Sequence, residues 1–450
     1  MFFQNSKWIF IEHREFSRVM HKFLLNNPAK QKAIAMRMWG ADKLPDYIKC
    51  YKEIKHEWLV KVPLGIAWFI DIDSDNAGNI PVVSIPEFIW VTPYDYQKEA
   101  IASLIRKPYG LLHATTGSGK TIMAIMLAQF YQTRTLIVVK DKTLLKQFVV
   151  DIQTMLGITP NYCGWTMTKK YKDSINTDVI ELTTIQSAEK VDTKRYWLII
   201  LDEVHTYLWS DKRREWVGNL TCQYMYGLTW TPVINDVDSR VFNIYIWPST
   251  VCNITNVTPD YCQVYSEFEY YLDDIKKFHE LKAELYNDQL RNNLIVDTVC
   301  DTIGKSKWLI FTDHVNHAKL LQEELNKRWI ETHILIGEVH QDERKRITEY
   351  VKEAKWPQVI VGSVQIIWTG FNLPELSRAY LTTTTRFKWD LLQYIGRIIR
   401  PHPTKPQPIF YDFVDINTSI LESQSNSRVK EFKKAFPKGK ITQSINSINF

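Results

Sequence analysis

The segment YGLLHATTGSGKTIMAIMLAQFYQ, residues 109–132, carries the pattern that best predicts the fold of this 450-residue chain. It begins with YGLLHA, which is typical of a buried strand, and ends in a run with the apolar spacing of an amphipathic helix. Between them lie two glycines, a lysine and a threonine. A strand, a glycine-rich loop and a helix in this order indicate a parallel α/β unit that binds phosphate groups.

The loop matches the pattern GxxxxGK[ST] from Ala114 to Thr121, with Ala114 in place of the first glycine. In such loops, backbone N–H groups and the positive end of the following helix bind phosphate oxygens. Lys120 is expected to reach the β- and γ-phosphates, and Thr121 is expected to bind Mg²⁺. The sequence therefore predicts a nucleoside triphosphate site whose other loop contacts come from Thr116, Gly117, Ser118 and Gly119.

Two further clusters have side chains that suit hydrolysis of the triphosphate. WLIILDEVH, residues 197–205, places Asp202 and Glu203 at the end of a buried strand. There Asp202 can hold the metal while Glu203 orients and deprotonates water. QYIGRIIRPHP, residues 393–403, is expected to put Arg397 and Arg400 on one side of a helix, about one turn apart. An arginine from a second domain can neutralise charge on the γ-phosphate when two domains close.

Short apolar runs rich in β-branched residues alternate with helical stretches twice along the chain, which predicts an α/β fold with two parallel sheets in tandem. The runs are residues 136–139, 197–203 and 224–231, and then residues 308–313, 333–337, 358–363 and 378–385. NIPVVSIPEFIWV at 80–92 is expected to form a strand and a connection that end a small α/β N-terminal domain. The predicted domains are residues 1–90, 91–262 and 263–450.

Basic residues are concentrated at the start of the chain. Residues 1–62 contain twelve Lys or Arg and six Asp or Glu, an excess equal to the net charge of +6 of the whole chain. Aromatic residues, among them Trp8, Trp39 and Trp58, are interleaved with the lysines and arginines. This composition favours a surface that binds a nucleic-acid backbone, but solvated lysines around an aromatic core would have the same composition.

The cysteine pattern and the hydropathy exclude several other classes of protein. The six cysteines are scattered without a CxxC pair, which indicates reduced structural thiols in a cytoplasmic protein and no zinc site. No run of about 18 apolar residues is present, so neither a membrane span nor a signal peptide is expected.

Five segments resemble motifs I, II, III, V and VI of the superfamily-two helicases and translocases. In order, they are residues 114–121, DEVH at 202–205, GLTWTP at 227–232, TGFNLP at 369–374 and QYIGRIIR at 393–400. The resemblance covers residues 93–415 and implies two RecA-like domains in tandem, with ATP and Mg²⁺ between them and nucleic acid across their top. Its length, DEVH box and basic N-terminal module make the chain most similar to the phage UvsW-type branch-migration helicases.

The resemblance also implies roles for residues outside the phosphate loop and the acid pair. PYDYQKEAI at 93–101 is similar to the Q motif, so Gln97 is expected to read the adenine edge. LTTIQSA at 182–188 is similar to the segment in which Thr184 and its neighbour Gln186 contact the phosphates of the nucleic-acid strand.

Motifs V and VI complete the implied ATP site. Gly370 would contact the nucleotide, and Gln393 would act in catalysis with Arg397 and Arg400. Two residues depart from the usual pattern, because Trp230 replaces a small residue in motif III and Asn372 replaces an aspartate in motif V. These departures affect the coupling of ATP to the strand and the contact near the ribose.

We expect a monomeric ATP-driven motor that moves on duplex or forked DNA with single-stranded segments and remodels branched intermediates. An RNA helicase of the DExH group shares the same motor parts, and a third alternative is an ATP-gated clamp that does not translocate. Removal of residues 1–90 is expected to leave a folded ATPase without preference for junctions or duplex. If this segment instead covers an apolar face of the first domain, truncation will produce aggregated protein.

Overall fold

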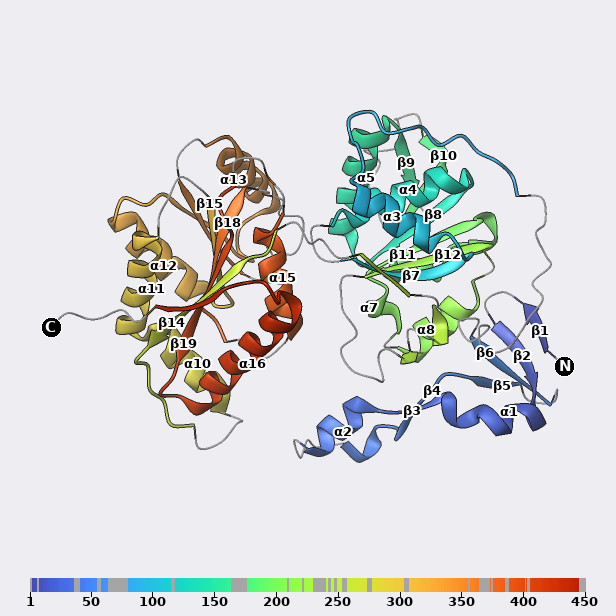
Figure 1. The fold of residues 1–450 in the computed structure, drawn as a ribbon, viewed down its shortest axis with the longest axis horizontal. Helices are drawn as coiled ribbons and strands as arrows, with labels where there is room; N and C mark the ends of the chain where they lie inside the picture. Colours follow the sequence, from blue (N-terminus) through green and yellow to red (C-terminus); the bar gives the residue numbers. More distant parts are fainter. Residues whose placement is uncertain are drawn as a thin grey trace. The chain divides into compact units, whose positions relative to one another are not determined.

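This computed structural model divides into two units between Asn253 and Ile254, and each unit contains one seven-stranded parallel β-sheet (Figure 1). The predicted α/β class with two tandem parallel-sheet domains is confirmed. The boundary expected after residue 262 falls inside strand β14 (Asp260–Ser266), which belongs to the second sheet. The structure describes residues 2–5, 8–35, 41–54, 58–63, 80–114, 118–162, 176–208, 210–220, 222–229, 240–241, 244–246, 249–252, 257–272, 277–302, 307–354, 357–363, 373, 375–384, 388–400, 402 and 405–444.

The first sheet is covered by helices on both faces. Its strands, in spatial order, are β13 (Ser249–Cys252), β7 (Tyr109–Ala114), β12 (Tyr224–Thr229), β11 (Leu198–Asp202), β8 (Thr135–Val139), β10 (Asn176–Thr184) and β9 (Thr159–Tyr162). Helices α3 (Asp95–Leu104), α4 (Lys120–Tyr131) and α5 (Lys142–Leu156) pack on one face, and α7 (His205–Leu208) and α8 (Asp211–Gly218) pack on the other (Figure 1). Every residue of β8 and β11 is buried, which explains why these strands read as continuous apolar runs.

The N-terminal module is a four-stranded antiparallel sheet with two short helices and a two-stranded ribbon. The sheet has the order β1 (Phe2–Asn5), β2 (Trp8–Glu12), β6 (Leu59–Pro63) and β5 (Lys52–Ile54); the other elements are α1 (His13–Val19), β3 (Leu24–Asn26), α2 (Pro28–Ala35) and β4 (Tyr47–Lys49). Its buried Ile11, Phe16 and Val60 belong to the same apolar cluster as Leu136 and Tyr245 of the first unit. This shared core favours the alternative in which the module covers an apolar face of the first domain.

Truncation of residues 1–63 is therefore expected to give aggregated or unfolded protein. Phe16 is 1% exposed and its ring centroid lies 4.7 Å from that of Tyr51, so the module has a packed core of its own that continues into the first unit. Loss of a single buried Phe side chain costs about 3–5 kcal/mol, and the truncation removes many such contacts. The measurement is the soluble fraction and the melting temperature of the truncated chain. A soluble truncation that unfolds cooperatively at the wild-type temperature would contradict this prediction.

Residues 80–92 do not form the expected strand. They run in an extended path along the C-terminal ends of α4 and α5, where Val83 N donates to Gln132 O and Ile89 N donates to Met155 O, both at 2.8 Å. The prolines at 81 and 86 have no N–H to donate, so the segment cannot form a regular ladder. The segment is held by helix ends, which sequence periodicity does not reveal.

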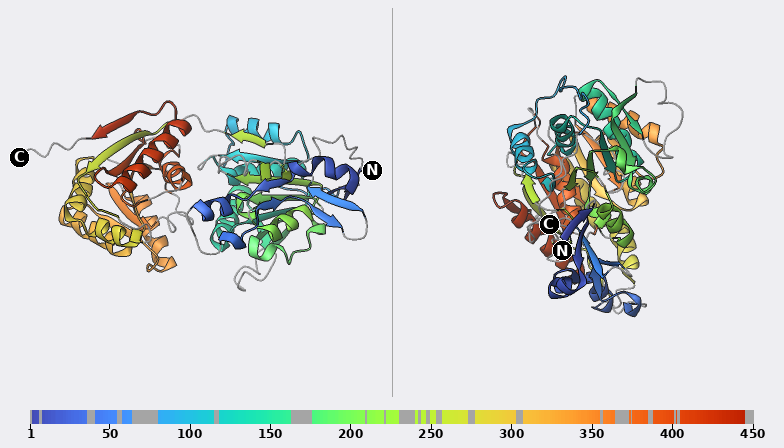
Figure 2. Two further views of the ribbon diagram at one scale, coloured as in Figure 1. Left: turned by 90° about the horizontal axis from the view of Figure 1, so that it is seen from below. Right: turned by 90° about the vertical axis from the view of Figure 1, so that its right-hand side faces the viewer.

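The second sheet is likewise enclosed by helices. Its strands, in spatial order, are β16 (Thr332–Leu335), β17 (Gln358–Ser363), β15 (Lys307–Thr312), β18 (Leu376–Leu381), β19 (Ile409–Asp415), β14 and β20 (Ile441–Ser444). Helices α11 (Gln289–Asp301) and α12 (Val315–Lys327) pack on one face, and α13 (Gln341–Glu353), α15 (Lys388–Ile398) and α16 (Ser419–Ala435) pack on the other. Helix α10 (Phe278–Asn287) packs against the start of α16, and Figure 2 shows these layers from two further directions.

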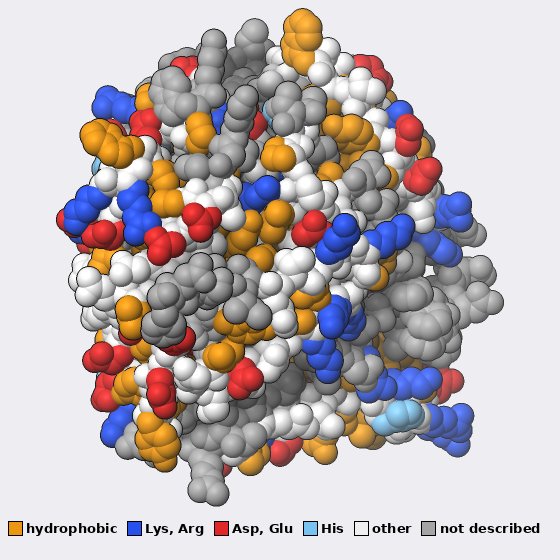
Figure 3. All heavy atoms as spheres, turned by 60° about the vertical axis from the view of Figure 1, so that its left-hand side comes forward, with side chains coloured by type: hydrophobic (Ala, Val, Ile, Leu, Met, Phe, Trp, Pro, Cys, Tyr) orange, Lys and Arg blue, Asp and Glu red, His pale blue; other side chains and the backbone are white. Residues whose placement is uncertain are grey.

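The surface carries charged side chains of both signs. On the face shown in Figure 3, Lys and Arg side chains appear together with Asp and Glu, among apolar and neutral residues. In the part of the chain that the structure describes, no helix has both the length and the apolar character needed to cross a membrane. The five cysteines within the described ranges are free thiols, and they are Cys50, Cys222, Cys252, Cys262 and Cys300.

Candidate ATP site

The carboxyl ends of three neighbouring strands bring the phosphate loop and the acid pair to one edge of the first sheet. Strand β12 lies between β7 and β11, and its Leu228 is opposite both Asp202 of β11 and Leu112 of β7. Because all three strands are parallel, the segments that follow them leave the sheet at the same edge. This is the edge at which parallel α/β sheets bind ligands.

Gln97 supports the end of the phosphate loop. Its side-chain carbonyl accepts a hydrogen bond from Tyr94 N at 2.9 Å, and its side-chain amide donates to Ser118 O at 2.7 Å. The hydroxyl of Tyr96 donates to the same Ser118 carbonyl at 3.2 Å. Gln97 is only 1% exposed. These contacts assign Gln97 a role in holding the loop, and its reading of the adenine edge stays a prediction.

Gly119 occupies a backbone conformation that only glycine adopts readily. Its φ is 78°, and it is the residue directly before α4. A Cβ atom at this position would lie 2.4 Å from Gln97 Nε2. The glycine therefore allows the loop to turn into the helix and to contact Gln97. The predicted nucleotide contacts of Thr116 and Gly117 lie outside the described residues.

Gly119→Ala is expected to raise the KM for ATP by about 5- to 150-fold, since a left-handed alanine and a displaced Gln97 together cost on the order of 1–3 kcal/mol. The matched control is Gly337→Ala, because a Cβ at Gly337 would meet no atom within 4 Å. Steady-state ATPase kinetics of both variants check the prediction. Equal KM values for the two variants would show that the Gln97 contact does not position the loop.

The acid pair lies against the lysine of the loop. Lys120 Nζ is 3.1 Å from Glu203 Oε1, and the two side chains are 15% and 17% exposed. Asp202 is more deeply buried, at 4% exposure. Burial and the neighbouring charge of Glu203 raise the pKa of Asp202 to about 7, while Lys120 opposes this rise. The site thus concentrates one cation and two carboxyl groups at the end of β11.

The donor atoms fit a magnesium ion. Asp202 Oδ1 is buried and has no hydrogen-bond partner within the described residues, and the same is true of the Ser118 hydroxyl. A buried carboxylate oxygen without a hydrogen bond is a suitable ligand for a hard cation that prefers oxygen. Asp202 would therefore hold Mg²⁺ together with Thr121, the second residue of α4.

Glu203 stands in strained backbone at the point where the chain leaves β11. Its φ is 48°, in the left-handed region, and the next residue, Val204, donates its N–H to Leu228 O at 3.0 Å. Strain of this kind persists where the surrounding structure enforces it, often at functional sites. The turn directs the Glu203 carboxylate toward Lys120.

His205 connects the acid pair to the end of β12. Its Nδ1 lies 2.9 Å from the hydroxyl of Thr229, within hydrogen-bond range, and 3.4 Å from Glu203 Oε2. Burial lowers the pKa of His205, although the charge of Glu203 opposes the shift, so the imidazole is neutral at pH 7. His205 belongs to the DEVH segment but had no predicted role of its own. Two features of the sequence could have indicated a role for His205. It lies two residues after Glu203, and Thr229 at the end of the next strand offers a hydroxyl as a hydrogen-bond partner.

The two predicted strand-contacting residues differ in exposure. Thr184 ends β10 with its side chain 1% exposed, and its hydroxyl lies 3.4 Å from that of Ser187. Gln186 is exposed on the short helix α6 (Ile185–Ala188), which follows β10 at the carboxyl edge of the sheet. Gln186 is therefore the better placed of the two to meet a ligand with its side chain, and strand binding stays a prediction for both.

Arg397 and Arg400 lie in the second unit but not on one helix face. Arg397 is in the last turn of α15, whereas Arg400 lies beyond the end of the helix at Ile398. The prediction that both arginines lie on one helix is wrong, because the proline at 401 disfavours helical backbone at the residue before it. Burial lowers the pKa of Arg397 to about 9 and that of Arg400 to about 10, and both remain cations at neutral pH.

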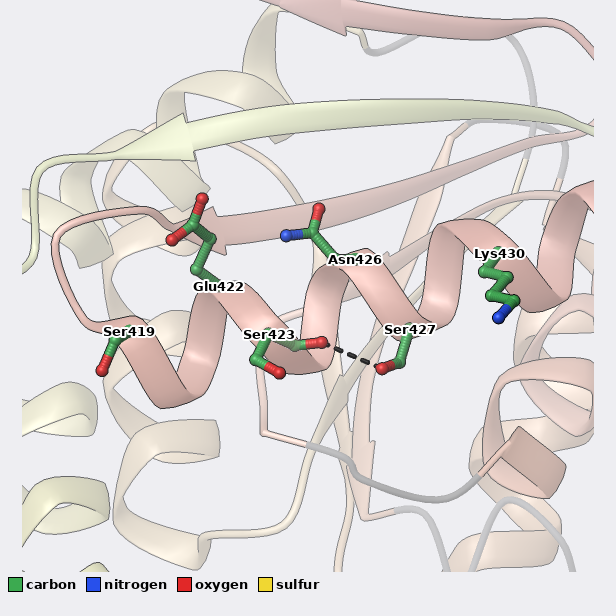
Figure 4. A pocket seen from close by; sticks show the side chains of 6 residues that line it. All are labelled: Ser419, Glu422, Ser423, Asn426, Ser427 and Lys430. Atoms are coloured by element: carbon green, nitrogen blue, oxygen red, sulfur yellow. Dashed lines mark hydrogen bonds between the residues drawn. The ribbon is translucent and has the colours of Figure 1, made fainter.

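Several predicted residues cannot be placed. Gly370, Trp230 and Asn372 lie outside the described residues, and Gln393 is described only as part of the backbone of α15. A pocket of the second unit lies on the exposed side of α16 (Figure 4). It is lined by Ser419, Glu422, Ser423, Asn426, Ser427 and Lys430, and it includes none of the predicted site residues.

Comparisons with known proteins follow the same division of the chain. Residues 91–234 match the family model "Type III restriction enzyme, res subunit", and residues 290–402 match "Helicase conserved C-terminal domain". A protein of Acanthamoeba polyphaga mimivirus named as an ATP-dependent RNA helicase is 25% identical over 342 residues, 72% of this chain and 64% of that protein. The chain thus spans slightly less than two thirds of the length of this relative.

A second relative and a solved structure extend the comparison. The ATP-dependent DNA helicase uvsW of Enterobacteria phage T4 is 22% identical over 367 residues, which are 76% of this chain and 72% of that protein. The structure of S. cerevisiae Dbp5 bound to RNA and ADP BeF3 has a TM-score of 0.53 and 16% sequence identity, and the match covers 79% of this chain and 90% of that chain. At this identity, the structural likeness shows a common fold.

Proposed function

Because the chain belongs to the superfamily-two helicases, we propose that it is an ATP-driven motor that moves on duplex or forked DNA and remodels branched intermediates. The observation that carries the proposal is the group of side chains at the carboxyl edge of the first sheet, in which Lys120 Nζ lies 3.1 Å from Glu203 Oε1 and His205 Nδ1 lies 2.9 Å from the Thr229 hydroxyl. This group places the phosphate loop beside the end of β12, in motif III.

ATP hydrolysis at this site would use Lys120, Glu203, and the metal ligands Asp202 and Thr121. Lys120 would bind the β- and γ-phosphates, and Glu203 would then exchange its contact with Lys120 for one with the attacking water, whose proton it accepts. Mg²⁺ held by Asp202 and Thr121 would supply charge neutralisation at the phosphates. His205, whose Nδ1 lies 2.9 Å from the Thr229 hydroxyl, would hold the end of β12 beside this site.

The choice of DNA over RNA rests on the name of the uvsW relative, and the basic N-terminal module favours a nucleic acid of either kind. The uvsW relative is named as a DNA helicase, but the mimivirus relative is named as an RNA helicase. The excess of six basic residues in residues 1–62 favours binding of a polyanion and lies outside every motor motif. An RNA helicase is therefore the second candidate function, and an ATP-gated clamp is the third.

A comparison of nucleic-acid cofactors tests the proposal. The ATPase rate of the full chain is measured with single-stranded DNA, duplex DNA, a four-way DNA junction and RNA, under the same salt conditions. We expect the greatest stimulation with the junction or the duplex. Equal or greater stimulation by RNA would favour the RNA helicase. ATP-dependent binding without nucleic-acid-stimulated turnover would favour the clamp.

A further inference from the structure

Two tryptophans have a left-handed backbone conformation and also an exposed indole ring. Trp58 has φ 50° and is 85% exposed, and Trp329 has φ 63° and is 97% exposed. A bulky residue in the left-handed region is rare, and an exposed indole gains nothing from burial in the fold. Trp58 belongs to the basic N-terminal module, whereas Trp329 follows helix α12 in the second unit.

The backbone of Trp58 is fixed to the core of the first unit. Its carbonyl accepts a hydrogen bond from His13 N at 2.8 Å, and the next residue begins β6. Val60 and Val62 of β6 are fully buried in the cluster that the module shares with the first sheet. Lys52 of β5 forms an ion pair with Glu215 of α8. The exposed indole is thus carried by a strand that is anchored to the ATP-binding unit.

Two exposed arginines lie on helix α1, whose first residue donates a hydrogen bond to the Trp58 carbonyl. Helix α1 starts at His13, whose N–H bonds to the Trp58 carbonyl, and its Arg14 and Arg18 are both exposed. Residues four apart lie on one side of a helix, about 6 Å apart along its axis. In the part of the chain described by the structure, no carboxylate lies within ion-pair distance of either guanidinium. The two charges are therefore available to an external anion.

We propose that Trp58, Arg14 and Arg18 form a binding site for an unpaired stretch of DNA. The indole stacks on one base, and the two guanidinium groups bind phosphates of the same strand. This inference rests on the proposed function, since it assumes a nucleic-acid substrate. A polyanion with flat apolar bases is the occupant that matches both the exposed ring and the unneutralised charges. Anchorage to the first unit would keep the released strand beside the motor.

Equilibrium binding of fluorescein-labelled oligothymidine to the full-length chain tests the site. Trp58→Ala is expected to weaken binding by about 5- to 150-fold, the range found for loss of one base–aromatic stack, whereas Trp58→Phe retains most of the affinity. The double variant Arg14→Gln, Arg18→Gln is expected to reduce the salt slope by about 1.4, since each phosphate contact on a single strand contributes about 0.7. Trp329→Ala is the matched control and leaves affinity unchanged.

Two further measurements separate a binding role from a structural one. Trp58→Gly relieves the left-handed strain, so it should raise the melting temperature while affinity falls. Photocrosslinking with an iodouracil-substituted strand should label Trp58. Wild-type affinity in Trp58→Ala and no crosslink at Trp58, with nucleic-acid-stimulated ATPase intact, would overturn this inference alone. If the wild-type chain neither binds the strand nor responds to any nucleic acid, the proposed function fails as well.

Discussion

Replacement of Lys120 by alanine is expected to reduce ATP turnover by about 10³-fold or more. Lys120 is the cation that lies 3.1 Å from Glu203, and its place in the loop predicts that it would bind the β- and γ-phosphates. Its charge also opposes the rise in the pKa of Asp202. Without Lys120 that pKa should rise further above about 7, so a larger fraction of Asp202 is protonated at neutral pH and binds Mg²⁺ less well.

The matched control for this variant is Lys98→Ala, because Lys98 is a half-exposed lysine on α3 that pairs only with the exposed Asp95 among the described residues. Glu203→Gln provides a second comparison, since the amide keeps the shape of the side chain but cannot accept the proton. It should retain ATP binding and lose turnover. The measurements are ATPase rate, nucleotide affinity and melting temperature. Near-normal turnover in Lys120→Ala would disprove the phosphate-loop assignment.

Arg400→Ala is expected to lower kcat by about 10³-fold while leaving the affinity for ATP within a few-fold of wild type. An arginine that meets the γ-phosphate only when the domains close acts mainly on the transition state. Both Arg397 and Arg400 are cations whose pKa is lowered by burial, and the negative charge of a γ-phosphate would favour the charged form of either guanidinium. Arg397 is the alternative residue for this role.

Separate measurement of kcat and KM for Arg400→Ala and Arg397→Ala distinguishes the two arginines. Arg346→Ala is the control, because this arginine is exposed and pairs with Glu343 on the same helix, α13. A large loss of kcat in one variant identifies the arginine that acts at the γ-phosphate. Small and equal effects in both variants would show that neither side chain reaches it.

Local sequence patterns were sufficient to predict the central strands and the segments that form the candidate ATP site. Both faces of the sheets are covered, so strands such as β8 and β11 are apolar throughout and can be recognised without knowledge of their neighbours. The loop before Lys120 is equally local, because its glycines and the start of α4 lie within a few residues. Asp202 and Glu203 follow a buried strand directly, so the order of strands and loops brings them to the edge where the phosphate loop lies.

Contacts between residues far apart in the chain were decided only by the tertiary structure. The side chain of Gln97 donates a hydrogen bond to the carbonyl of Ser118, 21 residues further along the chain. His205 lies within hydrogen-bond range of Thr229, 24 residues further along. The apolar residues of the N-terminal module predicted a core, but not that this core would continue into the first sheet. Periodicity shows which side chains a segment will bury, because burial repeats with the geometry of the helix or strand. It does not show which distant surface covers them, since that depends on how the segments pack in three dimensions.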